Sequence, residues 1–347
     1  GQTTTRGMTA EVVSRRFHTL ATIGNFNNQI GLPLTLLRLT AAHQWAVLEM
    51  GMNHPGEIRR LAALCNPRIG VITNVAAAHL AGLGSLEAVT RAKGELLAEL
   101  AADGTAVLNA DDPRVMALAA ETRQRVVRFA TAAAAEVQGR NLQPAALGTT
   151  FDLVLPGARA TVTLAVPGRF MVANALAAAA VGWTLGVDIA EIKAGLEAFR
   201  PITGRMVHRE LTGGIHLIDD TYNANPGSMA AAIQTLADLG RNARRMLVMG
   251  DMLELGEQSA ALHAASGELA ARSEPFRLLV AGRFREAVAR GARAGGLPRD
   301  RIFEGGRDEI LAALKKSLRP GDWILVKGSR GMGMETIVQG LMAWAGP

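Results

Sequence analysis

A chain of 347 residues is long enough for two domains, each with its own hydrophobic core. The net charge of +6 comes mostly from arginine and is interspersed with acidic residues, and only 4% of residues are aromatic, which argues against a nucleic-acid surface. The longest apolar run, ALAAAAVGWTLGV, is too short to span a membrane. Cys65 is the only cysteine, so no intrachain disulfide can form, and we expect a monomer in the reducing cytoplasm.

The first part of the chain alternates short apolar runs with helical patterns. Apolar runs that end in polar residues or glycine are typical of buried strands in a parallel sheet. Residues 125–166 instead alternate apolar and polar side chains between turn residues, which predicts antiparallel hairpins at the edge of that sheet. In chain order we expect parallel strands at 45–51, 69–75 and 105–112, a helix at 85–100 capped by Ser85, the hairpins, and helical structure at 171–199.

A second series of strands and helices follows FRPITGRM (199–206), whose proline and glycine are typical of a linker. We expect strands at 215–220, 244–251, 276–282 and 322–329, with helices between them. This alternation predicts a second α/β unit of Rossmann-like pattern. The predicted domains are therefore 1–203 and 204–347.

The first residues, GQTTTRGM, are similar to the second half of a phosphate-binding loop that leads into a helix. Such a loop needs glycine for close backbone approach, lysine for the β- and γ-phosphates, and Thr or Ser for Mg²⁺. Gly1, Thr3 and Thr4 fit this pattern, whereas Gln2 occupies the lysine position. A helix capped by threonine is the plainer interpretation of these residues taken alone.

Three ionisable side chains follow the predicted strands of the first unit. Glu49 ends the apolar run AVLE, where a carboxylate can hold Mg²⁺ beyond the carboxyl end of a parallel strand. His79 follows the next strand, and Lys93 lies on the helix after it. Taken alone, Glu49 is equally typical of a solvated side chain, and His79 and Lys93 are more typical of hydrogen-bonded or solvated side chains. The prediction of a common site therefore depends on their order and spacing.

Together with longer strings, these residues resemble the Mur ligase family over essentially the whole chain. GNFNNQIG, DTYNANP and GDMLELG are the most specific strings, and they resemble the members that add D-alanyl-D-alanine. Folylpolyglutamate synthetases share the general plan but are less similar in these strings. Further similar strings are GQTTT, LEMGMNHPGEI, TNVAAAHL, AKGE, LNADD, PGRFMVANALAAA and VKGSRGMGME.

The resemblance implies a central, mostly parallel-sheet ATPase domain of the phosphate-loop type, followed by a Rossmann-like C-terminal domain. It also implies that a UDP-binding domain and the first half of the phosphate loop precede Gly1 in the whole protein. The implied reaction belongs to peptidoglycan precursor synthesis. ATP converts the carboxylate of a UDP-muramoyl-tripeptide to an acyl phosphate, which the amine of D-alanyl-D-alanine attacks.

The resemblance further implies two Mg²⁺ ions, a carbamylated lysine and roles for individual residues. Thr3 and Glu49 would hold one ion, and His79 and carbamylated Lys93 the other. The implied nucleotide-binding residues are Gly1, Gln2, Thr3, Thr4, Asn174, Arg205, Asp220 and Asn223, and the implied substrate-binding residues are Asn25, Asn27, Asn28, Tyr222, Asn225, Lys327, Ser329 and Arg330.

Two positions depart from the family pattern. Gln2 stands at the position of the loop lysine, and Phe170-Met171 stands where the family has His-Asn, one of its adenine-reading positions. These departures keep open a non-catalytic nucleotide-binding protein, which an ATPase assay with tripeptide substrate would separate from a ligase. A sister ligase such as a folylpolyglutamate synthetase is the other alternative, which a panel of acceptor amines would separate.

Overall fold

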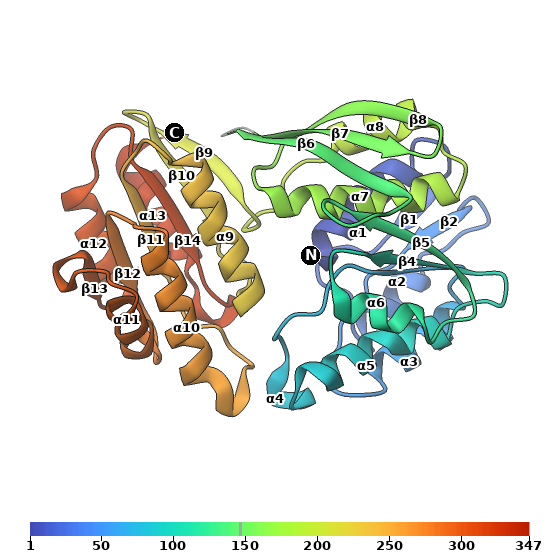
Figure 1. The fold of residues 1–347 in the computed structure, drawn as a ribbon, viewed down its shortest axis with the longest axis horizontal. Coiled ribbons are helices and arrows are strands. Elements are labelled where there is room, and N and C mark those ends of the chain that lie inside the picture. The colour runs from blue at the N-terminus through green and yellow to red at the C-terminus, as the bar shows by residue number, and fades with distance from the viewer. Residues whose placement is uncertain (146–147, 347) are drawn as a thin grey trace.

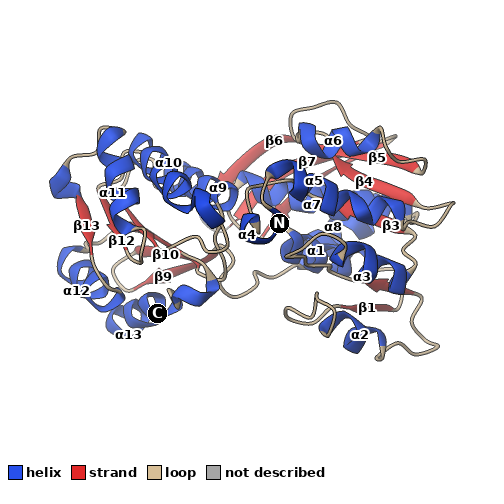
Figure 2. Ribbon diagram, turned by 90° about the horizontal axis from the view of Figure 1, so that it is seen from below, coloured by secondary structure: helices blue, strands red, loops and turns tan. Residues whose placement is uncertain are grey.

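Two α/β units lie side by side in the computed structural model, which describes residues 1–145 and 148–346 (Figure 1). The N-terminus lies near the junction of the two units in both views (Figures 1 and 2). Each unit contains a six-stranded sheet flanked by helices, and the first also contains a two-stranded sheet. The predicted α/β fold with largely parallel sheets is therefore confirmed.

The large sheet of the first unit has the strand order β3-β4-β5-β6-β7-β8. The pairs from β3 to β6 are parallel, and the pairs β6–β7 and β7–β8 are antiparallel. The strands are β3 (Ile69–Ile72), β4 (Thr105–Asn109), β5 (Arg125–Ala130), β6 (Val137–Ala145), β7 (Gly148–Leu155) and β8 (Ala158–Leu164).

Two expectations about this sheet are wrong. The strand that precedes Glu49, β2 (Trp45–Val47), does not join β3 but pairs in parallel with β1 (Thr19–Ala21). Residues 125–130 form the parallel strand β5 rather than part of an antiparallel hairpin. Its exposed Arg125 and Arg128 stand among more buried residues and, being three positions apart, lie on opposite faces, and this mixed pattern carries no information about strand direction.

The helices of the first unit are α1 (Gln2–Val13), α2 (Gly31–Leu36), α3 (Glu57–Cys65), α4 (Leu80–Leu83), α5 (Leu86–Ala98), α6 (Pro113–Ala119), α7 (Arg169–Thr184) and α8 (Ile189–Ala198). The Ser85 hydroxyl caps α5 by accepting a hydrogen bond from the backbone of Ala88, as predicted. The single helical stretch expected at 171–199 is two helices, α7 and α8. Glycine allows α1 to approach both, since a Cβ at Gly182 or Gly195 would lie 2.6 or 2.7 Å from atoms of Val12.

The sheet of the second unit has the order β13-β12-β11-β14-β10-β9, and only the edge pair β9–β10 is antiparallel. Strands β9 and β13, which form the two edges of this sheet, were not predicted. The strands are β9 (Val207–Leu211), β10 (Ile215–Asp220), β11 (Arg245–Met249), β12 (Arg277–Val280), β13 (Ile302–Glu304) and β14 (Trp323–Lys327).

The helices of the second unit are α9 (Pro226–Leu239), α10 (Ser259–Arg272), α11 (Arg285–Ala294), α12 (Arg307–Ser317) and α13 (Glu335–Ala345), with short 3₁₀ turns η1 (Gly256–Gln258), η2 (Arg299–Arg301) and η3 (Arg330–Met332). The Asn225 side chain caps α9 by accepting from the Ser228 backbone at 2.9 Å. Residue 203 lies between α8 and β9. The domain boundary at this residue stays a prediction.

Candidate functional site

A cleft of about 670 Å³ lies between the two units and is lined by residues that follow their strands. It brings together predicted site residues from both units. Asn174 and Ser329 do not line it. The predicted residues that do line it are Gly1, Gln2, Thr3, Thr4, Asn25, Asn27, Asn28, Glu49, His79, Lys93, Arg205, Asp220, Tyr222, Asn223, Asn225, Lys327 and Arg330.

Thr3 lies at the centre of a polar contact between the units. Its hydroxyl donates to Glu49 Oε1 at 3.0 Å and accepts from Arg205 Nη2 at 2.9 Å. Asn27 Nδ2 donates to the same Glu49 oxygen at 3.1 Å. A Cβ at Gly51 would lie 3.1 Å from the Asn27 side chain, so glycine leaves room for this approach. The arrangement joins the first turn of α1, the end of β2 and the linker.

Glu49 accepts hydrogen bonds at one carboxylate oxygen and forms an ion pair with Arg6 at the other. Its Oε2 is buried and accepts no hydrogen bond from the described residues, although Arg6 Nε lies 3.5 Å away. The side chain as a whole is buried, so water reaches this oxygen poorly. A buried carboxylate oxygen without a donor fits coordination of a hard cation such as Mg²⁺.

Lys93 lies on α5 and donates from Nζ to the backbone oxygen of Asn74 at 2.5 Å. Burial lowers the pKa of Lys93 to about 8, and the nearby Asp112 carboxylate partly opposes this shift. A substantial fraction of this amine is therefore neutral near pH 8, which is the form that can react with carbon dioxide.

His79 is the N-cap residue of the short helix α4 and has a left-handed backbone, with φ of 59°. Its Nδ1 lies 2.7 Å from Glu254 Oε2 of the second unit. Among the residues that the structure describes, Nε2 has no hydrogen-bond partner, and His79 lines the cleft. The imidazole therefore has one nitrogen engaged across the cleft and one available to a ligand.

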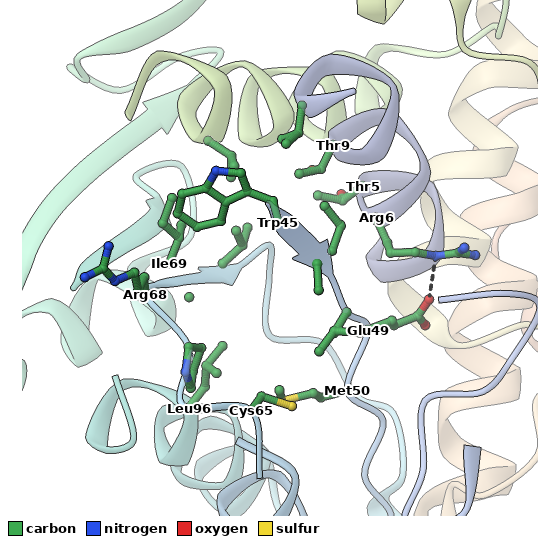
Figure 3. A pocket seen from close by; sticks show the side chains of 18 of the residues that line it. Thr5, Arg6, Thr9, Trp45, Glu49, Met50, Cys65, Arg68, Ile69 and Leu96 are labelled. Atoms are coloured by element: carbon green, nitrogen blue, oxygen red, sulfur yellow. Dashed lines mark ion pairs between the residues drawn. The ribbon is translucent and has the colours of Figure 1, made fainter. Parts of the chain in front are cut away.

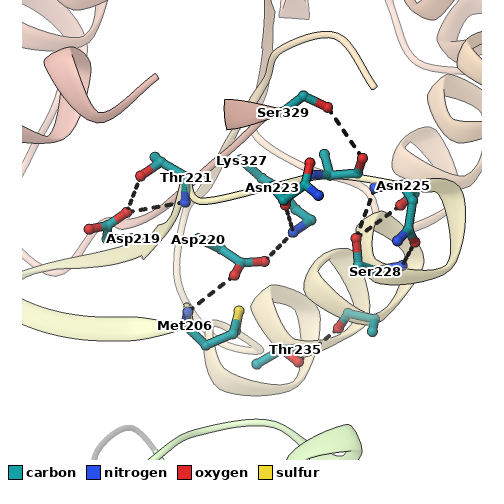
Figure 4. Close-up of polar contacts among 12 residues, drawn as sticks. Met206, Asp219, Asp220, Thr221, Asn223, Asn225, Ser228, Thr235, Lys327 and Ser329 are labelled. Atoms are coloured by element: carbon teal, nitrogen blue, oxygen red, sulfur yellow. Dashed lines mark hydrogen bonds and ion pairs between the residues drawn. The ribbon is translucent and has the colours of Figure 1, made fainter. Parts of the chain in front are cut away.

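The second unit contributes a buried ion pair at the ends of β10 and β14 (Figure 4). Lys327 Nζ lies 2.5 Å from Asp220 Oδ2 and donates to the backbone oxygen of Asn223 at 2.9 Å. Asp220 Oδ1 accepts from the backbone of Met206 at 3.2 Å. Lys327 is only 2% exposed, so its charge depends on these partners.

Tyr222 lies between two arginine side chains. The guanidinium carbons of Arg205 and Arg330 lie 4.2 and 5.7 Å from the centre of its ring. Both distances fall within the range of cation–π attraction. The positive charges of Arg205, from the linker, and Arg330, from η3, therefore lie close together at the Tyr222 ring.

Asn174 and Ser329 lie behind the cleft wall. Asn174 is buried and accepts a hydrogen bond from Thr5, while its amide contacts Met171. Ser329 donates to the Ala224 backbone and accepts from the Leu253 backbone. Both side chains support neighbouring segments here, and their predicted ligand roles stay predictions.

Two residues at the cleft were not assigned a role from the sequence. Glu254 belongs to the string GDMLELG, which was recognised as specific, but no spacing rule connects it to His79 across 175 residues. Phe170 lines the cleft beside Met171, so the two departures from the family's His-Asn pair lie in the predicted nucleotide site.

Within residues 1–145 and 148–346, no three His, Cys, Asp or Glu side chains converge well enough to hold a metal ion. A Mg²⁺ ion here would therefore take one or two protein ligands and complete its shell with phosphate and water oxygens, as Mg²⁺ commonly does. Over the same residues, no helix is both long and apolar enough to cross a membrane.

A second cavity of about 340 Å³ lies between β2 and β3 (Figure 3). Its walls include both strands and apolar side chains of α1, α5 and α7. In the described part of the chain, β2 pairs only with β1, and β3 only with β4. The edges of the two sheets therefore face each other across this cavity and do not pair directly. Arg6 lines this cavity and not the cleft, so it lies on the far side of Glu49.

Comparison with known proteins agrees with the arrangement of these units. Residues 1–182 match the Mur ligase middle domain, and residues 204–330 match the Mur ligase, glutamate ligase domain. The chain is 40% identical to UDP-N-acetylmuramoyl-tripeptide–D-alanyl-D-alanine ligase of Escherichia coli (strain K12), over 98% of this chain and 75% of that protein.

Solved structures show the same similarity. MurF from Acinetobacter baumannii superimposes with a TM-score of 0.91 at 32% identity, covering 99% of this chain and 74% of that one. MurF ligase from Thermotoga maritima in complex with ADP gives 0.87 at 25% identity, with coverage of 99% and 77%. Because two adjacent domains match in order and the similarity extends over nearly the whole chain, this protein belongs to the Mur ligase family.

Proposed function

We propose that this chain carries the catalytic part of an ATP-dependent ligase that joins D-alanyl-D-alanine to a UDP-muramoyl-tripeptide. The observation that carries the proposal is the single cleft in which Thr3, Glu49, Lys93 and His79 face Arg205 and Asp220. The similarity to ligases of that name over nearly the whole chain supports the choice of substrates. The product belongs to peptidoglycan precursor synthesis.

The first unit supplies the groups that hold the phosphates of ATP. The backbone N–H groups at the start of α1 are oriented to bind an anion, as at any helix N-terminus. The hydroxyl of Thr3 and the carboxylate of Glu49, which are in contact, would hold a Mg²⁺ ion beside the β- and γ-phosphates. Arg205 approaches Thr3 from the linker and adds positive charge where negative charge develops during phosphoryl transfer.

A second Mg²⁺ ion would lie between His79 and a carbamylated Lys93. Carbamylation joins carbon dioxide to the neutral amine and converts a cation into a carboxylate-like ligand. The lowered pKa of Lys93 supports this assignment, because the neutral amine is accessible near physiological pH. Bound there, the ion would stabilise the anionic carboxylate and acyl phosphate of the peptide substrate.

The second unit would hold the nucleoside and the peptide. Asp220 and Asn223 are assigned to the nucleotide, and Lys327 and Arg330 to the peptide carboxylates. Tyr222 and Asn225, with Asn25, Asn27 and Asn28 opposite, are assigned to the two peptide substrates. The cleft location of these side chains supports their roles. We further propose that the protein acts as a cytoplasmic monomer.

A coupled assay of ADP and phosphate release tests the proposal. The full ligase should release phosphate only when ATP, Mg²⁺, the UDP-muramoyl-tripeptide and D-alanyl-D-alanine are all present, and should form the pentapeptide product. Replacing D-alanyl-D-alanine with glutamate should give no product, whereas a folylpolyglutamate synthetase would use glutamate. Nucleotide binding without any ligation would instead support the non-catalytic alternative, which the neutral Gln2 favours.

A further inference from the structure

The second unit contacts a proposed metal ligand of the first unit directly. We propose that Glu254 is a positioning residue that orients His79 toward the metal ion and completes the ion's site only when the two units come together. The inference rests on the proposed function, because His79 must be a metal ligand for it to hold. Neither the family similarity nor the substrate assignments give Glu254 a role.

Glu254 is attached to the first unit at two points. Its Oε2 lies 2.7 Å from His79 Nδ1, and its backbone oxygen accepts from the backbone N–H of Ala81 at 3.0 Å. The turn η1 packs against α4. One residue of the second unit therefore fixes both the imidazole and the start of the helix that carries it.

The hydrogen bond determines which nitrogen of His79 can bind a metal. A carboxylate only accepts, so Nδ1 carries the proton in this contact. In a neutral imidazole, Nε2 then holds the lone pair. Pairing of a metal-bound histidine with a carboxylate through its other nitrogen fixes the ring orientation and raises its basicity as a ligand.

Hydrogen bonds to the rest of the second unit hold the loop that carries Glu254 in place. Asp251 accepts hydrogen bonds from the backbones of Arg283 and Phe284 at 2.7 and 3.0 Å. The Met252 backbone donates to His263 Nε2, and the Leu253 backbone donates to Ser329 Oγ, both at 2.9 Å. Successive residues of the loop are thus anchored to three parts of the second unit.

Both partners of the contact have left-handed backbones. Glu254 has φ of 65° and His79 has φ of 59°, a conformation that is uncommon outside glycine and, among other residues, is enriched in asparagine, aspartate and histidine but not in glutamate. Such conformations persist only where surrounding contacts enforce them, and they occur often at functional sites. An incidental surface ion pair would not require a left-handed backbone at both of its residues.

Manganese binding tests the inference without relying on turnover. Mn²⁺ would be titrated into the full ligase with a non-hydrolysable ATP analogue, and free Mn²⁺ would be followed by electron paramagnetic resonance. Glu254→Ala should weaken Mn²⁺ binding at the His79 site by about 10- to 100-fold, and Glu254→Gln should have a smaller effect in the same direction. Glu257→Gln, an exposed neighbour, is the matched control and should bind like the wild type.

The His79→Ala variant separates failure of this inference from failure of the proposed function. In that background, Glu254→Ala should cause no further loss of Mn²⁺ affinity, because Glu254 acts through His79. If His79→Ala weakens binding and Glu254→Ala does not, Glu254 has no positioning role and the proposed function stands. If His79→Ala itself leaves Mn²⁺ affinity unchanged, the metal assignment of His79 in the proposed function is wrong.

Discussion

The two faces of the cleft differ in how completely their polar groups are paired. On the face of the second unit, Lys327, Asp220 and the Asn223 backbone form a closed buried network. On the face of the first unit, Glu49 Oε2 accepts no hydrogen bond and has only Arg6 Nε at 3.5 Å, and burial lowers the pKa of Lys93. The second face is therefore assembled before any ligand arrives, whereas the first retains groups whose best partners are ligands.

The paired groups of the second face suit a rigid site, whereas the incompletely paired groups of the first face suit a reactive one. A buried ion pair with full hydrogen bonding holds its side chains in one geometry, which suits recognition of a substrate of fixed shape. A buried carboxylate oxygen without a hydrogen bond and an amine of lowered pKa are costly in the free protein and gain most from binding a metal ion or reacting. The comparison predicts that breaking the buried Lys327–Asp220 pair strongly lowers stability, whereas mutations on the first face change mainly activity.

The largest expected effect is on stability, at Lys327. Lys327→Ala leaves the Asp220 carboxylate buried without its cation, which should lower the free energy of unfolding by about 3–5 kcal/mol. Urea denaturation followed by circular dichroism measures this loss. The exposed Lys316→Ala is the control and should change little. The double variant Lys327→Met with Asp220→Leu should lose less than Lys327→Ala, and a fully additive loss would contradict the buried-pair interpretation.

Replacing Lys93 should abolish most activity while leaving the fold intact. Lys93→Ala removes the proposed metal-binding carbamate, so kcat should fall on the order of 10²–10³-fold, and bicarbonate should not restore it. Phosphate release measures the rate, and Lys193→Ala on α8 is the matched lysine control. A wild-type rate for Lys93→Ala would show that Lys93 has no role in the mechanism.

The lowered pKa of Lys93 also makes carbamylation depend on pH. Below about pH 8 the amine is mostly protonated and cannot attack carbon dioxide, whereas above it the neutral amine predominates. The carbamate signal in ¹³C NMR with labelled bicarbonate should therefore rise as pH increases from 6.5 to 8.5. Lys93→Ala should lack this pH-dependent signal, and a signal of the same size in that variant would place the carbamate elsewhere.

Restoring a cation at residue 2 should raise activity more modestly. Gln2 is neutral and donates from Nε2 to the Met50 backbone at 3.1 Å. Arg6 is already engaged by Glu49 and by the backbone oxygens of Thr22 and Gly24, so we do not expect it to replace the missing charge. Gln2→Lys should therefore increase kcat at least tenfold and leave the KM for peptide nearly unchanged. A lower or unchanged kcat would mean that Arg205 already supplies the required charge, or that residues 1–4 do not contact phosphate.

The smallest expected effect is a change in overall dimensions. The units touch through Arg205–Thr3 and His79–Glu254, so ligands that bind both faces should favour these contacts. Solution X-ray scattering should show a small decrease in the radius of gyration when ATP analogue, Mg²⁺ and tripeptide are added together. Identical scattering from a complex shown to be saturated would count against closure of the cleft before chemistry.

Much of the site was predictable because its residues follow recognisable local patterns. Glu49 ends an apolar run, Asp220 and Lys327 end strands, and the Ser85 and Asn225 caps begin helices. Parallel strands place their carboxyl ends at one edge, so residues at those positions converge whatever the intervening sequence. Strand direction was harder to predict. The mixture of polar and apolar residues in β5 was interpreted as a hairpin strand, but the segment pairs in parallel on both sides.

The sequence by itself determined the α/β class, most strands and helices, and the set of polar residues around one cleft, because these depend on local periodicity and on residue type. Only the tertiary structure decided which of those residues pair. It paired Arg6 with Glu49 and Lys327 with Asp220, and it brought Glu254 into contact with His79, which is 175 positions away in the sequence. No local pattern encodes such contacts, because they arise from the packing of distant segments against one another.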